Sequence, residues 1–261
     1  MPEQLPSNLS QKIRVLFTDV DDTLTFNGEI PFETIQAIHQ LRAAGILVVP
    51  VTGASAGWCD CLLKTLPIKY IVGENGAFYM EQAEGGHTII HYLKAAEQVD
   101  QDLDELKELA IKLKKTFPDI GFTQDQNFRI SDVALDIGQA VKVDFFRAKQ
   151  ATEWLKSQGV NAKLSSIHIN IWIGDYNKAS GAMAWLETQQ IALGECAFIG
   201  DSTNDEAMFE SIPLTVGVAN VQRFLPTLSH KPDYITQQNG GLGFIELANA
   251  LLDKKIEYKI Y

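Results

Sequence analysis

The chain has 261 residues, of which 46% are hydrophobic, and a formal net charge of -11 at pH 7. This length suits one large domain or two modest domains, and the negative charge disfavours nucleic acid or an anionic membrane as partner. No apolar run approaches the ~20 residues of a membrane span, and the polar N-terminus lacks the apolar core of a signal peptide. Three Cys residues do not suggest a disulfide framework, so we expect a cytoplasmic protein.

The first expected strand ends in a cluster of carboxylates. Residues 14–25 read R-V-L-F-T-D-V-D-D-T-L-T, so Asp19, Asp21 and Asp22 directly follow the apolar run of a buried parallel strand. Carboxylates this close repel one another unless a cation or a catalytic task compensates for their charge. An acidic turn that caps the next helix would explain Asp22, but not the alternation of Asp19 and Asp21. We therefore interpret this pair as part of a site.

Helices and strands alternate after this segment. Helical spacing covers residues 32–44 and recurs around Leu62 and Leu63, and strands are expected at residues 46–51 and 70–72. This βαβαβ order implies right-handed crossovers and a parallel sheet.

From about Met80 the pattern becomes that of an inserted α/β segment. It is expected to hold helices at residues 99–117 and 148–158, and strands at residues 87–92, 128–137 and 166–173. Core elements then resume at Ala179, and a last helix is expected at residues 244–252. We divide the chain accordingly into a core of residues 1–80 and 173–261 and an insertion of residues 81–172.

Three later polar segments also lie at expected element ends. Thr52-Gly53-Ala54-Ser55 follows the second strand and offers a hydroxyl and backbone N–H groups to a phosphate oxygen. Lys178 is expected in the first turn of a helix, where a cation opposes the helix dipole and suggests an anionic partner. Residues 200–205, G-D-S-T-N-D, place Asp201, Asn204 and Asp205 after another strand. Ligands of open α/β sheets bind outside the carboxyl ends of the strands, so we expect these residues to converge.

Together these segments resemble the four motifs of the haloacid dehalogenase superfamily of phosphohydrolases. The motif D-x-D-x-[TV] corresponds to residues 19–23, the Ser or Thr after a strand to Thr52, the Lys that opens a helix to Lys178, and G-D-x-x-N-D to residues 200–205. All four occur in the order of the family.

Two shorter segments narrow the resemblance. E-N-G-A at residues 74–77 and V-A-N at residues 218–220 are similar to the Cof-type and sucrose-phosphatase-like branch. The resemblance implies a Rossmann-like, doubly wound parallel sheet core, with the insertion as an α/β cap that governs substrate specificity.

The residue types suit hydrolysis of a phosphate monoester, which requires an in-line nucleophile, a proton for the leaving group and positive charge on the transferring oxygens. Asp19 is the expected nucleophile and would form an aspartyl-phosphate. Asp21 is the expected acid that protonates the leaving group and then deprotonates water. The phosphoryl oxygens are expected to be held by Thr52, Gly53, Lys178 and Asn204.

A cation is required where two carboxylates meet a phosphate dianion. The oxygen ligands Asp19, the backbone carbonyl of Asp21, and Asp201 suit Mg²⁺. Asp205 is expected either to bind this metal directly or to support a residue that does.

The substrate contacts are less sharply indicated. Many relatives carry T-G-R where this chain reads Thr52-Gly53-Ala54, so a contact from that Arg is not expected. In the cap, Arg129 and Lys142 are candidates to meet a distal acidic or sugar group, although both also fit exposed strand charges.

Two further pairs of residues have competing interpretations. Glu74 and Asn75 are candidates to bind a sugar hydroxyl, although Asn-Gly is also an ordinary turn. His168 and Trp172 alternate on one expected strand, and we interpret them as packing or cap surface.

The sequence therefore predicts a Mg²⁺-dependent phosphatase of a small phosphorylated metabolite, most plausibly a sugar phosphate. A phosphosugar mutase that resembles phosphomannomutase is the nearest alternative, and a non-catalytic regulatory protein on the same fold is a further one. A phosphorylated signalling receiver would need an acceptor Asp after the third strand, and the loops after Val51 and Val72 offer none.

Overall fold

The central element of the fold is a six-stranded parallel sheet. The computed structural model describes residues 1–9, 11–165 and 167–252. All neighbours in the sheet pair in parallel, in the order β1 (Glu3–Gln4), β13 (Tyr234–Ile235), β12 (Leu214–Gly217), β11 (Cys196–Gly200), β2 (Val15–Thr18) and β3 (Leu47–Pro50). The chain thus brings the ends of β2, β3 and β11 to one edge.

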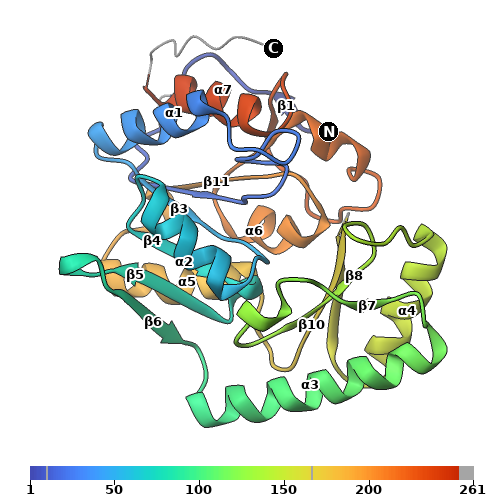
Figure 1. Cartoon of the computed structure of the whole chain (residues 1–261). Coiled ribbons are helices and arrows are strands. Elements are labelled where there is room, and N and C mark those ends of the chain that lie inside the picture. The colour runs from blue at the N-terminus through green and yellow to red at the C-terminus, as the bar shows by residue number, and fades with distance from the viewer. Residues whose placement is uncertain (10, 166, 253–261) are drawn as a thin grey trace.

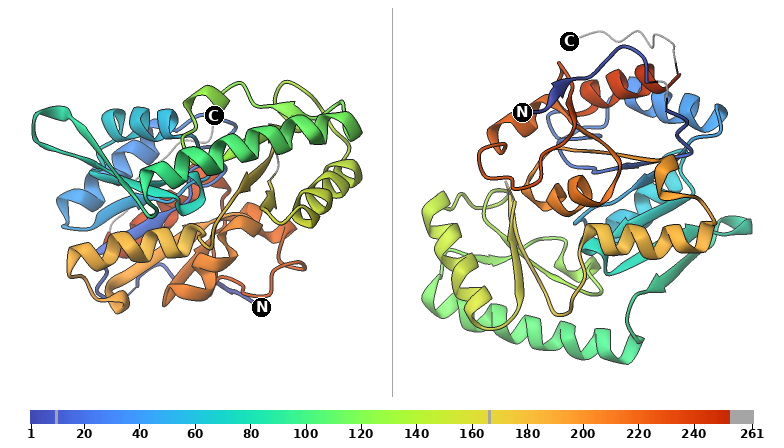
Figure 2. Two further views of the ribbon diagram at one scale, coloured as in Figure 1. Left: turned by 90° about the horizontal axis from the view of Figure 1, so that it is seen from below. Right: turned by 180° about the vertical axis from the view of Figure 1, so that it is seen from behind.

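Helices cover both faces of this sheet (Figures 1 and 2). One face packs on α1 (Phe32–Ala43), α2 (Ala56–Thr65) and α7 (Gly240–Leu252), and the other on α5 (Lys178–Gln189) and α6 (Glu206–Ser211). Strand β2 shows why: Leu16 joins the first hydrophobic cluster, whereas Val15 and Phe17 join the second. Successive side chains of a strand point to opposite faces, so a continuous apolar run is buried on both sides.

An antiparallel extension follows α2. It consists of β4 (Tyr70–Gly73), β5 (Phe78–Gln82) and β6 (Thr88–Tyr92), which pair in this order. The expected third parallel strand is β4, but it meets the central sheet through a single parallel bridge, from Val51 to Val72. The βαβαβ order is therefore confirmed, while the parallel pairing of its third strand is confined to one residue pair.

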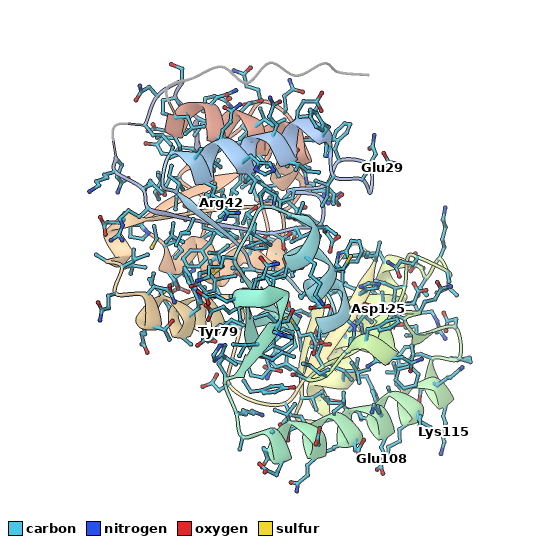
Figure 3. All side chains as sticks on the ribbon, turned by 60° about the vertical axis from the view of Figure 1, so that its left-hand side comes forward. Glu29, Arg42, Tyr79, Glu108, Lys115 and Asp125 are labelled. Atoms are coloured by element: carbon cyan, nitrogen blue, oxygen red, sulfur yellow. The ribbon has the colours of Figure 1, made fainter. Side chains whose placement is uncertain are left out.

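The inserted segment forms a second α/β unit. Its antiparallel sheet has the order β7 (Gly121–Phe122), β8 (Val133–Asp136), β10 (His168–Trp172) and β9 (Asn161–Leu164). Helices α3 (Ala96–Thr116) and α4 (Phe145–Ser157) pack on it and share a hydrophobic cluster that includes Leu106, Leu155 and Ile169. The charged face of α3, with Glu108 and Lys115, points to solvent (Figure 3).

This architecture confirms the predicted fold class, a parallel α/β core with an inserted α/β unit. The domain boundaries at residues 80/81 and 172/173 stay a prediction. Strand β6 lies within the predicted cap range but pairs with β5 next to the core. Among the described residues, none of the helices combines the length and the apolar character that crossing a bilayer requires.

The expected strand at residues 128–137 is wrong in its first half. A short 3-10 helix covers Gln126–Phe128, and β8 begins only at Val133. The backbone N–H groups of Ile130, Ser131 and Asp132 donate to the Glu74 carboxylate and not to a neighbouring strand. The strand expected at residues 166–173 is β10, and residue 166 lies outside the described residues.

Three helices begin earlier than the hydrophobic spacing indicates. Helix α3 starts at Ala96, α7 at Gly240, and α4 at Phe145. Asp144 explains the start of α4, because its side chain accepts from the N–H groups of Phe146 and Arg147 as an N-cap.

Candidate active site

The loop after β2 carries the first two candidate residues. The N–H of Asp19 donates to the carbonyl of Ile199 at 2.9 Å and so continues the pairing of β2 with β11. The chain then turns, with a left-handed φ of 57° at Asp22, whose N–H donates to Thr25 Oγ1 at 2.8 Å. This turn holds Asp19 and Asp21 at the carboxyl end of β2.

Lys178 is the buried cation of the site. It is the first residue of α5, as predicted, and Asn177 caps this helix with a capping box. Its Nζ donates to Asp19 Oδ1 at 2.6 Å and to Asp205 Oδ1 at 2.7 Å. Burial alone would lower the pKa of Lys178, but these two carboxylates more than offset it and raise the pKa above its usual value. The anionic partners expected for Lys178 are therefore these two aspartates.

The loop after β11 supplies Asp201 and Asp205. Asp205 Oδ2 accepts from the N–H groups of Asp201 at 2.9 Å and Ser202 at 3.1 Å. A Cβ on Gly200 would lie 2.5 Å from Asp205 Oδ2, so only glycine leaves room for this carboxylate. Asp201 Oδ2 accepts from Asn220 Nδ2 at 3.0 Å. Hydrogen bonds thus fix the loop within itself, through Asp205, and to the segment that carries Asn220.

The carboxylates of Asp19, Asp201 and Asp205 form a buried acidic group. Oxygen atoms of the three residues lie within 4.8 Å of one another. Burial raises the pKa of Asp19 well above its usual value despite Lys178, and burial together with Asp205 raises the pKa of Asp201 to about 7. A divalent cation at this place would stabilise the ionised carboxylates, so the donor set fits a hard metal ion with oxygen ligands.

The loop after β3 lies beside this group. Thr52 is fully buried, its N–H donates to the carbonyl of Val72, and its Oγ1 accepts from the N–H of Ala54 at 3.1 Å. The carbonyl of Gly53 accepts from Arg129 Nη1 at 3.0 Å, which ties this loop to the cap.

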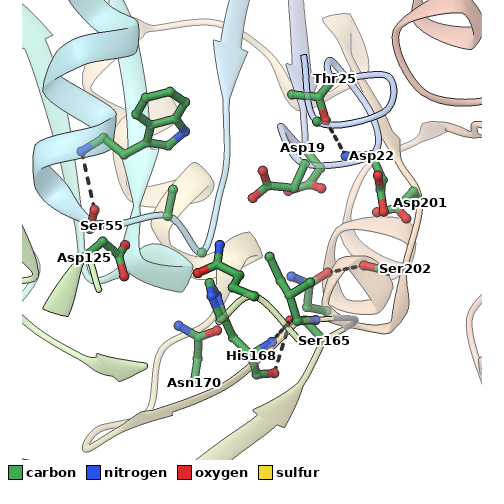
Figure 4. Close-up of a pocket in the computed structure, with 18 of the residues that line it drawn as sticks. Asp19, Asp22, Thr25, Ser55, Asp125, Ser165, His168, Asn170, Asp201 and Ser202 are labelled. Carbon is green, nitrogen blue, oxygen red and sulfur yellow. Dashed lines mark hydrogen bonds between the residues drawn. The ribbon is translucent and has the colours of Figure 1, made fainter. Parts of the chain in front are cut away.

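A cavity of about 570 Å³ separates the core loops from the cap. Figure 4 shows Asp19 and Asp201 on the core side and His168 and Asn170 on the cap side. Asp21 also lines the cavity, and its side chain is exposed there. Partial removal from bulk water raises the pKa of Asp21 above its usual value, and the nearby Lys178 offsets part of this rise. A carboxyl group with a raised pKa can hold a proton for a leaving group.

Several predicted residues lie on the cavity wall and others do not. The lining includes Asp19, Asp21, Gly53, Arg129, Asp201 and Asn204. Asn75 and Lys178 lie at a second hollow on the other side of Asn204. Lys142 is exposed in the loop between β8 and α4 and is not part of the lining of either hollow.

Glu74 does not lie where we expected it, at a position to bind a sugar hydroxyl. It is fully buried, and its carboxylate accepts from the N–H of Ala56 at 2.9 Å and from the N–H groups of Ile130, Ser131 and Asp132 at 2.6 to 3.1 Å. Its φ of 41° is unusual for a residue other than glycine. Glu74 therefore joins the core to the cap and does not face the cavity.

Other residues that line the cavity or contact its lining were not recognised as such from the sequence. Asn220 and Arg223 contact Asp201, and V-A-N had indicated only a family branch for Asn220. The alternation of His168 and Trp172 suggested packing or cap surface. Trp172 is buried, and His168 lies on the part of the cap surface that lines the cavity. Asp125 lines the cavity from a segment with no regular pattern, so no periodic signal pointed to it.

Comparisons with known proteins agree with this geometry. The family model of the haloacid dehalogenase-like hydrolases matches residues 16–116 and 112–243. A phosphoglycolate phosphatase of Methanothermobacter thermautotrophicus is 26% identical over 90% of this chain and 96% of its own length.

Two solved structures share the fold. A HAD/COF-like hydrolase of Plasmodium vivax aligns with a TM-score of 0.70 and 18% identity, over 93% of this chain and 97% of its own. The sucrose-phosphatase of Synechocystis, solved with sucrose and phosphate, aligns with a TM-score of 0.65 and 17% identity, over 91% of this chain and 96% of its own. The resemblance read from the motifs is thus confirmed, and the chain belongs to the haloacid dehalogenase-like hydrolases, as a phosphoric monoester hydrolase.

Proposed function

We propose that this phosphatase depends on Mg²⁺ and hydrolyses a small phosphorylated metabolite, with a sugar phosphate as the favoured substrate. The observation that carries the proposal is the position of Asp19. It lines the cavity of about 570 Å³, and the buried Lys178 ammonium holds its carboxylate at 2.6 Å. A fixed carboxylate at the wall of a cavity this large can meet the phosphorus of a bound ester.

The proposed chemistry has two steps. A carboxylate oxygen of Asp19 attacks phosphorus, the bond to the leaving oxygen breaks, and Asp21 gives that oxygen its proton. Asp21 then takes a proton from water, the water oxygen attacks the aspartyl-phosphate, and the bond from phosphorus to Asp19 breaks. The phosphoryl oxygens are proposed to be held by Lys178, the side chain of Thr52, the N–H of Gly53 and the amide of Asn204.

The metal ligands that we propose are the carboxylates of Asp19 and Asp201 and the carbonyl of Asp21. Bound Mg²⁺ would neutralise part of the charge of the phosphate and of these carboxylates. Both oxygens of Asp205 already accept hydrogen bonds, Oδ1 from Lys178 and Oδ2 from two backbone N–H groups. We therefore assign Asp205 to holding Lys178 and the loop that carries Asp201.

The cap is proposed to select the leaving group. Its residues form the side of the cavity opposite Asp19, where Trp58 from the core also offers an indole ring that is 46% exposed. Relatives named phosphoglycolate phosphatase make 2-phosphoglycolate the second candidate substrate. The free thiols Cys59, Cys61 and Cys196 support the proposed cytoplasmic location.

Phosphate release from a panel of esters tests the proposal. The purified protein is incubated with glucose 6-phosphate, glycerol 3-phosphate, 2-phosphoglycolate and related esters, first with Mg²⁺ and then with excess chelator. We expect turnover with Mg²⁺, loss of turnover in chelator, and recovery when Mg²⁺ is added back. Ca²⁺ should restore little, because it prefers longer bonds and more ligands. Full activity in excess chelator would contradict the metal assignment.

A further inference from the structure

The arginine side chains that line the cavity already form ion pairs with carboxylates. At the cap end, Arg129 Nη1 donates to Asp132 Oδ1 at 2.7 Å and Nη2 donates to Asp125 Oδ2 at 3.2 Å. The Arg129 side chain is 1% exposed and that of Asp132 is fully buried. One guanidinium thus faces two carboxylates.

Asp125 is the member of this group that belongs to the cavity wall. Its side chain is 35% exposed and lines the cavity, whereas Asp132 lies behind Arg129. Burial raises the pKa of Asp125, but Arg129 together with Thr123 and Ser55 outweighs it and holds the pKa below its usual value. Asp125 is therefore ionised at neutral pH.

The other two basic side chains of the lining do not offset this charge. Arg223 lies on the core side, 3.4 Å from Asp201 and 3.5 Å from Asp22. His168 is at the cap end, where burial and Arg129 lower its pKa to about 4, so its imidazole is neutral. Its Nε2 is buried and has no hydrogen-bond partner among the described residues.

On the basis of the proposed function, we propose that Asp125 makes the cap end of the cavity select leaving groups without a carboxylate. A leaving group with hydroxyls can pack on Trp58 without bringing a second negative charge next to Asp125. A second anion would be repelled by the Asp125 carboxylate and would find Arg129 engaged on both Nη atoms. The chain would thus differ from its relatives named phosphoglycolate phosphatase.

Matched pairs of esters test the selection in the intact protein. Glycerol 3-phosphate and 3-phosphoglycerate have the same number of carbons, and so do 2-hydroxyethyl phosphate and 2-phosphoglycolate; the members of each pair differ in a carboxylate. With Mg²⁺ present, we expect kcat/KM to be at least about tenfold higher for the alcohol of each pair. Equal or better turnover of the acids would overturn the inference. Absence of turnover with every ester would instead contradict the proposed function.

The variant Asp125→Asn tests the residue. It removes one charge without changing shape and leaves Arg129 with Asp132 alone, so the preference for alcohols over acids should fall by about tenfold. Asp104→Asn is the matched control, because Asp104 is 81% exposed on α3 and far from the lining, and it should leave the preference unchanged. Asp125→Ser should shift the preference in the same direction, and it serves as the test if Asp125→Asn does not fold. An unchanged preference in a folded Asp125 variant would show that another group sets it.

Discussion

The two sides of the cavity balance their charges in different ways. On the core side, Lys178 joins Asp19 and Asp205. These residues come from three distant parts of the chain and meet because β2 and β11 end, and α5 begins, at one edge of the sheet. On the cap side, Arg129 is neutralised by Asp125 and Asp132 from the same short segment. The core carboxylates outnumber their buried cation, which suits the metal ion that we propose there. In the cap, the cation is already paired with carboxylates, so no unpaired positive charge remains for a second anion among the described residues of the cap lining.

The largest effect is expected from Asp19→Asn, which removes the proposed nucleophile from the core side. An amide has nearly the same shape but is a poor nucleophile, so kcat should fall by at least about 10⁴-fold. The fold should be kept, since losing a charge among crowded carboxylates relieves repulsion. Steady-state phosphate release and thermal unfolding measure the two effects. Asp22→Asn is the control and should stay within about threefold of wild type; substantial turnover by Asp19→Asn would remove Asp19 as nucleophile.

A smaller loss of activity, equal for all esters, is expected from Lys178→Met. Lys142→Ala in the cap is the control. Lys178 is buried against Asp19 and is proposed to touch the phosphoryl group that every substrate shares. Its loss should lower kcat/KM by about 10²-fold for all esters alike, by analogy with the removal of one preorganised donor. Lys142 is exposed and outside the lining, so its variant should change kcat/KM by less than about twofold. A change of preference among esters in Lys178→Met would contradict the placement of the phosphate.

The smallest effect concerns the cap side and appears as a dependence of stability on pH. The imidazole of His168 has a pKa of about 4 in the folded protein against an ordinary 6.5, so the unfolded chain binds more protons between these values. Its neutral state thus contributes stability above pH 6.5 that is lost as the pH falls toward 4. Between these limits, the unfolding free energy of wild type relative to His168→Gln should rise by about 2 kcal/mol. Urea unfolding at several pH values measures it, and parallel curves would argue against a buried neutral imidazole.

The core side was readable from the sequence because its chemistry follows regular structure. Asp19, Thr52 and Asp201 each come directly after an apolar strand, and parallel strands place their carboxyl ends together. The ends of such strands are fixed by backbone pairing, so the residues that follow inherit a defined position. The continuous apolar runs, together with the rule that ligands bind outside the carboxyl ends of parallel strands, were then sufficient to predict which loops meet.

The cap side was not readable in the same way. The pattern of residues 128–137 predicted a strand, but β8 begins only at Val133, because the polar groups just before it bond to Glu74, to Gly53 and to one another. Such contacts depend on the tertiary position of single side chains, which no local pattern records. Arg129 was named as a candidate from its charge alone, and neither its burial nor its pairing with Asp125 followed from the sequence.

The contact of Glu74 with the cap has a consequence for how the enzyme can diversify. The hydrogen bonds that its carboxylate accepts from the cap come only from the main-chain N–H groups of residues 130–132, and every residue except proline provides such a group. Mutations in neighbouring cap side chains therefore leave this attachment in place. A lineage can replace the residues that recognise the leaving group one at a time, while each intermediate keeps a cap that is seated on the same catalytic loops.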